Sequence, residues 1–256
     1  MTLMAFRSSN KPQKQGAHGV ARVISKRGYC SRSQAEKLVR EGHVILRGKP
    51  VRDPETSAYE NDEILVDGTP VTASEFVYFA MNKPRGIVTT ASDEKGRKTV
   101  MDLFREQFTK KFPGKPMPHI APVGRLDAAS EGLLLFTNDT AWADRVLTDA
   151  THKKIYRVQV KGIPTGAELA QMEHGFNVAP RVFGESEEFM HADRAILHSE
   201  GDKNCWLEIT LSEGKNREIR RMLAHLGYEV TRLMRIQFDK YSLGDLKPGE
   251  IRAIQV

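Results

Sequence analysis

A single carboxylate stands out at residue 127, where the sequence reads Gly-Arg-Leu-Asp shortly before an apolar run. Asp127 follows Arg125 by two positions and precedes the apolar residues 133–136, so we expect a tight loop leading into a buried strand. Gly124 and Gly132 lie on either side of the loop and let its backbone turn sharply. Because an unpaired buried charge is costly, the carboxylate needs a cationic partner. The loop holds either a structural ion pair or the reactive group of an enzyme.

A second candidate is Tyr156, which lies in an alternating run over residues 155–160. Tyr156, Val158 and Val160 share one face of the strand that this alternation predicts. The ring therefore faces the interior or a pocket. It is either a core tyrosine whose hydroxyl finds a partner nearby or a flat surface that holds a substrate.

The third candidate is a basic segment at residues 212–223. Placed on a helix, it separates into two stripes, of which the apolar one consists of Ile219, Met222, Leu223 and Leu226. The opposite stripe carries Arg217, Arg220 and Arg221. Arginines near the start of a helix oppose its dipole, which favours negative charge there. They are explained either by an anion such as a phosphate or carboxylate nearby, or by an ordinary solvated face.

These segments supply one carboxylate, one aromatic ring and a group of arginines. The sequence contains no arranged Ser–His pair, no phosphate-binding glycine loop, no His-Glu-x-x-His and no convincing second catalytic carboxylate. The set suits covalent or electrostatic chemistry through one aspartate on a flat substrate. Because the surrounding surface is basic, we expect that substrate to be a nucleobase within RNA or DNA.

Composition agrees with a polyanionic partner. The 256 residues carry a net charge of +6 and the pI is about 9.3. Cys30 and Cys205 form neither a disulfide framework nor a zinc-site spacing, which favours a reducing cytoplasm and no metal site. No apolar run approaches the length of a membrane span, and the first residues lack the apolar core of a signal peptide. We therefore expect a cytoplasmic protein with no membrane partner.

The chain is predicted to begin with two distinct parts. Residues 1–17 form a basic tail that we expect to be flexible. Residues 18–74 form a small α/β unit, whose second helix begins at a capping box made by Ser31 and Gln34. The many cations of this unit, among them Arg32 and Arg47, are either a solvated face or a surface for one extended polyanion.

Residues 75–256 form the second unit. Its predicted helices cover residues 100–108, 138–147 (capped by Asn138), 168–175 and the basic segment. Its predicted strands cover residues 76–81, 87–90, 133–136, 155–160, 205–211 and 229–236. This order favours an α+β domain with a mainly antiparallel mixed sheet flanked by helices.

Four motifs in this order make the chain similar to a known family: Asn-Lys-Pro-Arg-Gly at 82–86 with Thr89, residues 124–139, Lys-Ile-Tyr at 154–156, and residues 214–222. They resemble the bacterial pseudouridine synthases that modify single uridines in ribosomal RNA and carry an N-terminal S4-type RNA-binding domain. Residues 28–44 resemble that S4-type domain. The resemblance covers nearly everything from residue 20 onward, and its one departure is Thr140, where a glycine is common.

The resemblance implies that a uridine is converted to pseudouridine with no cofactor and no metal. Asp127 is then the catalytic aspartate, and it either attacks the ribose or removes a proton from it. By the same resemblance Arg220 pairs with Asp127, and Tyr156 stacks on the uracil and assists proton transfer. The target base must be flipped out of the folded RNA, which costs a few kcal/mol.

The resemblance also suggests RNA contacts. Arg125 would hold the flipped strand and fill the gap, and Leu233 would pack beside the pocket. Lys83, Arg217 and Arg221 are our candidates for phosphate contacts. The S4-type unit would act as a docking arm that reads RNA shape and phosphates. We expect ribosomal RNA of the large or small subunit as the partner, and a monomeric protein.

Three other interpretations remain open. The chain could be a non-catalytic RNA-binding or ribosome-assembly factor, although such a module has no need of a carboxylate among basic groups. It could hydrolyse nucleoside or glycosidic bonds, although those enzymes usually need two carboxylates or an activated water. It could modify transfer RNA, and only the analogy of the S4-type arm favours ribosomal RNA.

Overall fold

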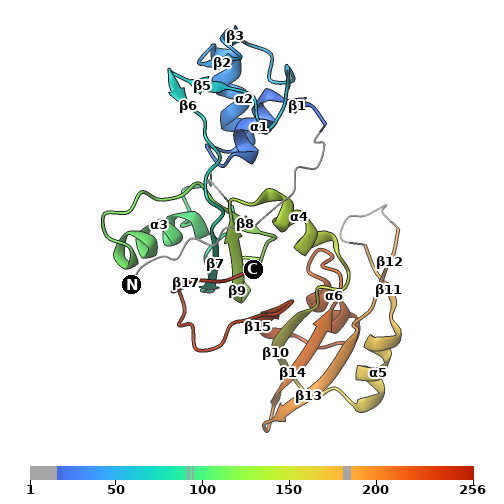
Figure 1. The fold of residues 1–256 in the computed structure, drawn as a ribbon. Coiled ribbons are helices and arrows are strands. Elements are labelled where there is room, and N and C mark those ends of the chain that lie inside the picture. Colours follow the sequence, from blue (N-terminus) through green and yellow to red (C-terminus); the bar gives the residue numbers. More distant parts are fainter. Residues whose placement is uncertain (1–15, 91–92, 94, 181–185) are drawn as a thin grey trace. The chain divides into compact units, whose positions relative to one another are not determined.

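A computed structural model describes residues 16–90, 93, 95–180 and 186–256 (Figure 1). The chain separates into two compact units, Met1–Glu75 and Phe76–Val256, and each has its own apolar core. The division falls one residue after the predicted one. The predicted basic tail lies outside the described residues except for 16 and 17.

The first unit packs two helices against short strands. Its elements are β1 (His18–Gly19), α1 (Val20–Lys26), α2 (Arg32–Glu41), β2 (Val44–Leu46), β3 (Lys49–Val51), β4 (Ser57–Ala58), β5 (Ile64–Val66) and β6 (Thr69–Pro70). Ser31 and Gln34 form the predicted capping box, and Gly42 ends α2 in the left-handed conformation. The antiparallel sheet has the order β3-β2-β5-β6. Its hairpins turn at Arg47-Gly48 and Asp67-Gly68, all with positive φ.

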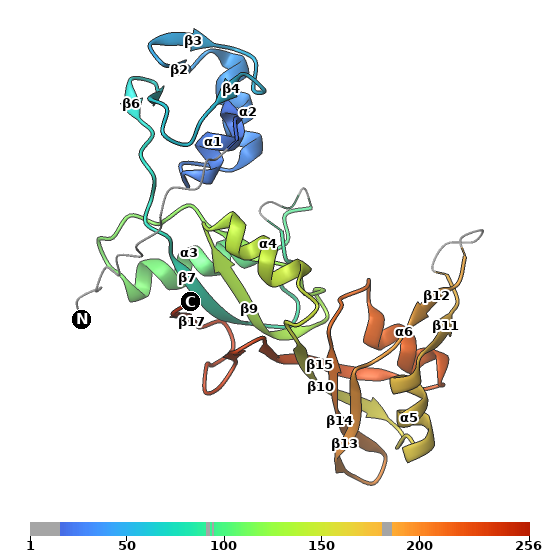
Figure 2. The same ribbon diagram turned by 45° about the vertical axis from the view of Figure 1, so that its right-hand side comes forward.

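The second unit is built on one large sheet (Figures 1 and 2). Its helices are α3 (Val100–Lys111), α4 (Thr140–Thr148), α5 (Gly166–His174) and α6 (Glu218–His225). Its strands are β7 (Tyr78–Lys83), β8 (Ala121–Val123), β9 (Glu131–Thr137), β10 (Lys154–Lys161), β11 (Phe176–Val178), β12 (Glu188–Met190), β13 (Arg194–Glu200), β14 (Asn204–Leu211), β15 (Val230–Phe238), β16 (Tyr241–Ser242) and β17 (Ile251–Ala253).

The strand order is β13-β14-β10-β15-β9-β7-β17, with β16 paired to β15 and β8 to β9. The pair β15 and β9 is parallel, whereas the other pairs of this sheet are antiparallel. This confirms the predicted α+β class with a mainly antiparallel sheet. The strands β11 and β12 form a separate hairpin.

Strand β9 joins the two cores of the second unit. Leu134 and Phe136 pack in the core that contains α3, whereas Leu133 and Leu135 pack in the core that contains Trp142 of α4. Because both faces are covered, the strand is continuously apolar rather than alternating. The helix α5 lies alongside β13 and β14 in both views, and α6 packs its apolar side into the same core as β10 (Figures 1 and 2).

Two local predictions are wrong. Residues 87–90 do not form a strand, because Val88 makes only an isolated bridge with Thr99, and the Thr89 hydroxyl donates instead to the Leu126 carbonyl. The helix α4 is capped by Asp139 rather than by Asn138, since the Asp139 side chain accepts the Trp142 N–H.

Candidate active site

Asp127 lies in the loop between β8 and β9, as predicted. A turn closes this loop, because the Ser130 N–H donates to the Asp127 carbonyl at 2.9 Å. Gly132 follows at the start of β9 with a φ of +101°, and its backbone lies against that of Arg235. A Cβ atom at residue 132 would meet the Arg235 carbonyl oxygen at 2.3 Å, so only glycine allows this approach. The loop carrying Asp127 is therefore fixed directly to the centre of the sheet.

Lys83 occupies a different place from the one predicted. It is fully buried at the end of β7, and its Nζ atom donates to the carbonyl oxygens of Pro84, Asp127 and Ser130 at 3.1, 3.1 and 2.7 Å. A phosphate contact is excluded in this structure because the ammonium group is enclosed by the Asp127 loop. Burial lowers the pKa of Lys83 to about 8, while the nearby carboxylates of Asp127 and Glu131 oppose this shift.

The cation paired with Asp127 is Arg217, not Arg220. Arg217 Nη1 lies 3.3 Å from Asp127 Oδ2, and both side chains are partly exposed, at 41% and 34%. Arg220 instead donates from Nη2 to the carbonyl of Ala129 and from Nη1 to that of Val230. It thus ties the Asp127 loop to the beginning of β15. Burial is the main cause that lowers the pKa of the Arg220 guanidinium, Arg217 lowers it further, and Asp127 raises it.

The beginning of α6 explains this exchange of partners. The helix starts at Glu218, and Arg217 precedes it with a φ of +52°, in the left-handed region. Because Arg217 lies outside the helix, helical spacing does not predict the direction of its side chain. The predicted apolar stripe is present, because Ile219, Met222 and Leu223 are buried.

Tyr156 is connected to the Asp127 loop through the sheet. It is paired with Arg235 of β15, and Arg235 is paired with Gly132 at the start of β9. Tyr156 is 8% exposed on the same face as Val158 and Val160, as the alternation predicted. Within the part of the chain that the structure describes, its hydroxyl forms no hydrogen bond. Tyr156 is thus linked through Arg235 to Gly132, which lies where the Asp127 loop enters β9.

Two further predicted site residues, Arg221 and Leu233, contact other parts of the protein. Arg221 is an internal anchor, because it forms an ion pair with Glu188 at 2.5 Å and donates to the Ala179 carbonyl. Because the guanidinium group of Arg221 already has these two partners, the structure argues against the predicted phosphate contact. Leu233 is 8% exposed in the main core and is paired with Val158 of β10, which is the strand of Tyr156.

The predicted surface cations remain exposed. Arg125 is exposed, and among the described residues it has no ion pair or hydrogen bond. In the first unit, the side chains of Arg32 and Arg47 are 53% and 50% exposed. Arg32 pairs with Glu36 and Glu55 on the surface. Such exposed pairs contribute little energy, so these guanidinium groups can exchange partners.

Two further groups at the site were not assigned from the sequence. Thr89 Oγ1 donates to the Leu126 carbonyl at 2.7 Å and so holds the residue before Asp127. Lys154 is 6% exposed and binds the backbone of Ser212 and Glu213, in the segment that leads to Arg217. The alternation of β10 is the signal for Lys154, because it places this lysine on the same buried face as Tyr156.

The site contains no evident metal centre. Within the described part of the chain, histidine, cysteine and carboxylate side chains do not gather in threes that could hold a metal ion. Among the same residues, no helix has the length and apolarity needed to cross a membrane.

Comparison with known proteins identifies both units. Residues 77–225 match the family model described as RNA pseudouridylate synthase, and residues 20–64 match the S4 domain. The chain is 35% identical to the ribosomal large subunit pseudouridine synthase B of Bacillus subtilis, over 91% of this chain and 90% of that protein. It is 33% identical to an uncharacterized RNA pseudouridine synthase of Mycobacterium leprae, over 98% and 94% of the two chains.

A solved structure supports the same assignment. The crystal structure of a pseudouridylate synthase matches with a TM-score of 0.60 and 27% identity, over 93% of this chain and 96% of that one. The family model, the relatives and the fold agree, and the relatives and the solved structure match more than nine tenths of this chain. This chain belongs to the RNA pseudouridylate synthase family and carries an N-terminal S4 domain.

Proposed function

We propose that this protein converts a specific uridine of ribosomal RNA to pseudouridine and that Asp127 carries the chemistry. The observation that supports this best is the Asp127 carboxylate, which is partly exposed and paired with Arg217 at 3.3 Å. The charged carboxylate thus has a cationic partner and remains open to solvent. Three interactions that anchor its loop, from Lys83, Thr89 and Arg220, would hold it in one position.

The proposed reaction is an internal rearrangement. The bond between ribose C1′ and base N1 breaks, the base rotates, and a bond forms between C1′ and C5. The C5 proton leaves and N1 gains a proton, so no oxidant, cofactor or metal is consumed. Asp127 would start the reaction either by attacking the ribose or by removing a ribose proton.

The flipped base needs a surface that replaces the stacking it loses. In the proposal this surface is the ring of Tyr156, which lies two strands from the start of β9. Arg125 is suited to hold the opened RNA, because it is an exposed cation two residues before Asp127. Arg220 would act through the Ala129 carbonyl rather than on the substrate.

Ribosomal RNA is the proposed substrate because a relative that is 35% identical is named for the large ribosomal subunit. The S4 domain would dock this RNA by its shape and phosphates, through exposed cations such as Arg32 and Arg47. We further propose that the protein acts in the cytoplasm as a monomer.

The test is a map of pseudouridine in total RNA from cells with and without this protein. We expect one or a few signals to disappear from ribosomal RNA, with the large subunit as the first place to look. Their return with the wild-type gene but not with the Asp127→Asn gene would link the loss to this site. Loss confined to transfer RNA would contradict the proposed substrate, and an unchanged map would contradict the proposed activity.

A further inference from the structure

We propose that Lys154 is a positioning residue, which holds the segment 212–217 in place from the strand that carries Tyr156 and so sets where Arg217 meets Asp127. This inference rests on the proposed function of the Asp127 site. It assigns a role to a buried cation whose hydrogen-bond partners are the backbone of Ser212 and Glu213 rather than Asp127.

Lys154 lies in a buried position, where the removal of its ammonium group from water costs free energy. It is 6% exposed, and its Nζ atom lies 3.2 Å from the Ser212 carbonyl, 3.4 Å from the Glu213 carbonyl and 5.3 Å from the centre of the Phe238 ring. Burial lowers the pKa of Lys154, and Arg235 lowers it further. A buried ammonium group is tolerated only with good partners, and here those partners are backbone carbonyls of one segment.

The position of Lys154 on β10 makes it a link between two parts of the site. Its side chain shares the buried face of Tyr156, which follows two residues later. The carbonyls that it binds begin the segment that ends at Arg217. One side chain thus connects the strand of the aromatic ring to the segment of the cation.

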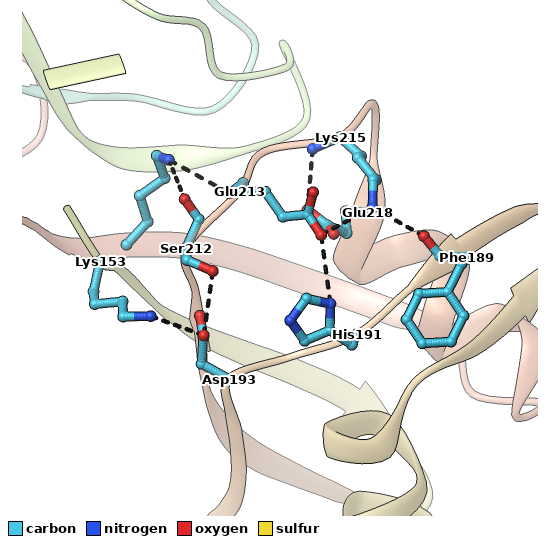
Figure 3. Close-up of polar contacts among 9 residues, drawn as sticks. Lys153, Phe189, His191, Asp193, Ser212, Glu213, Lys215 and Glu218 are labelled. Atoms are coloured by element: carbon cyan, nitrogen blue, oxygen red, sulfur yellow. Dashed lines mark hydrogen bonds and ion pairs between the residues drawn. The ribbon is translucent and has the colours of Figure 1, made fainter. Parts of the chain in front are cut away.

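Further contacts hold Ser212, Glu213 and Lys215 of this segment, and Figure 3 shows them together with Glu218, which follows the segment. Lys215 Nζ bridges Glu213 Oε1 and the Phe189 carbonyl, both at 2.9 Å. The Lys215 N–H donates to Glu218 Oε2 at 3.0 Å. Ser212 Oγ donates to Asp193 at 3.2 Å. The segment is therefore a fixed structure, which can transmit a shift at Ser212 and Glu213 to its far end.

Arg217 is sensitive to such a shift. Its φ of +52° is unusual for a residue with a side chain, so the surrounding contacts must hold its backbone in this conformation. Its ion pair with Asp127 is long, at 3.3 Å. If the backbone moves by about 1 Å, the pair separates, and misplacement on this scale costs up to about a hundredfold in rate.

The test compares four variants on a ribosomal RNA fragment: Lys154→Met, Lys161→Met, Arg217→Met and the double variant Lys154→Met with Arg217→Met. Lys161 is the matched control, because it lies on the same strand, is 60% exposed and pairs with Glu229, outside the segment 212–217. We expect Lys154→Met to lower kcat about tenfold or more with KM within about twofold, and Lys161→Met to keep both. The double variant should fall no more than about twofold below Arg217→Met, because Lys154 acts through Arg217.

The proposal is overturned if Lys154→Met keeps kcat within about twofold, or if the effects of Lys154→Met and Arg217→Met multiply in the double variant. Lys154→Gln, a shorter neutral donor, is the second variant and is judged by the same criteria. If circular dichroism shows that neither variant folds, the lysine is a stability residue, and the proposal also fails.

A measurement that needs no activity separates this inference from the proposed function. Hydrogen exchange of the wild type and of Lys154→Met is compared at residues 212–217. We expect faster exchange there in the variant, and unchanged exchange in β7, which is separated from β10 by β15 and β9. Unchanged exchange at 212–217 overturns the positioning role. An inactive wild type with faster exchange in the variant would contradict only the proposed function.

Discussion

The Nζ atom of Lys83 donates a hydrogen bond of 3.1 Å to the backbone carbonyl of Asp127. The ammonium group is fully buried, and its two other acceptors are the carbonyls of Pro84 and Ser130. An ammonium group has three N–H donors, so these acceptors satisfy it. A lysine at the end of β7 therefore fixes the loop that carries the proposed catalytic carboxylate.

We expect Lys83→Met to lower kcat about tenfold or more while the Kd for RNA stays within about twofold. The methionine fills similar space but leaves buried carbonyls without a donor, which we expect to cost about 1–3 kcal/mol of stability. The measurements are single-turnover pseudouridine formation and RNA binding by filter retention. A phosphate-binding lysine would give the opposite pattern, with weaker binding and unchanged turnover.

Lys83 also predicts a pH dependence of stability. Its pKa is about 8 in the folded protein and near 10.5 in an unfolded chain, so between these values the unfolded chain binds more protons. The contribution of Lys83 to the free energy of unfolding therefore rises with pH from about 8 to 10.5.

In the full-length protein, tryptophan fluorescence reports this pH dependence for the second unit only. Both tryptophans of the chain, Trp142 and Trp206, lie in that unit, so their fluorescence in urea follows its unfolding. The wild type should gain stability relative to Lys83→Met between pH 7.5 and pH 9.5. A constant difference between the two proteins would show that Lys83 has an ordinary pKa.

We expect Gly132→Ala to destabilise the second unit by about 2–5 kcal/mol. The added Cβ would lie 2.3 Å from the Arg235 carbonyl oxygen, and the φ of +101° is strained for alanine. Gly166→Ala is the control, because a Cβ there meets nothing within 4 Å. Tryptophan fluorescence in urea gives both values. Equal stability of the two variants would mean that β9 and β15 are not in close contact at Gly132.

Arg217 and Arg221 should respond differently to removal of their charge. Arg217→Met should lower kcat about tenfold or more, because Arg217 pairs with Asp127. Arg221→Met should lower stability through loss of the pair with Glu188 while kcat of the folded protein stays within about threefold. Steady-state kinetics and thermal unfolding separate the two effects. Equal losses of RNA affinity and unchanged kcat in both variants would instead assign both arginines to phosphate contacts.

Deletion of residues 1–74 should weaken RNA binding about tenfold or more and leave kcat at saturating RNA within about threefold. The first unit has its own core, and its exposed cations are suited to phosphates. The assay compares full-length and shortened protein on the same ribosomal RNA fragment at constant salt. Equal turnover and equal affinity on a minimal hairpin would count against a docking role for this unit.

Local signals in the sequence predicted most of the elements near the site. The apolar run of β9, the alternation of β10 and the capping box of α2 each depend on residues close together in the chain. The same kind of signal located Asp127 in a loop directly before β9. Helical spacing also identified the buried side of α6.

The partners within the site could not be predicted in this way. The ion pair joins Asp127 to a residue 90 positions later, and one contact of Lys83 reaches 47 positions along the chain. Such contacts depend on how strands pair and where a helix begins. The resemblance to the family favoured Arg220. The helical spacing that placed Arg217 on the same stripe does not apply to it, because α6 begins only at Glu218. The sequence does not show which three carbonyl groups surround Lys83, since every residue has a backbone carbonyl.

The central claim is that Asp127 carries out the conversion of uridine to pseudouridine, and Asp127→Asn tests it most directly. The change keeps the shape of the side chain and removes its charge, so RNA binding should stay within about threefold. Single-turnover product formation on ribosomal RNA should fall at least about a thousandfold. If the asparagine variant forms pseudouridine at the rate of the wild type, Asp127 is a structural residue and the account is contradicted.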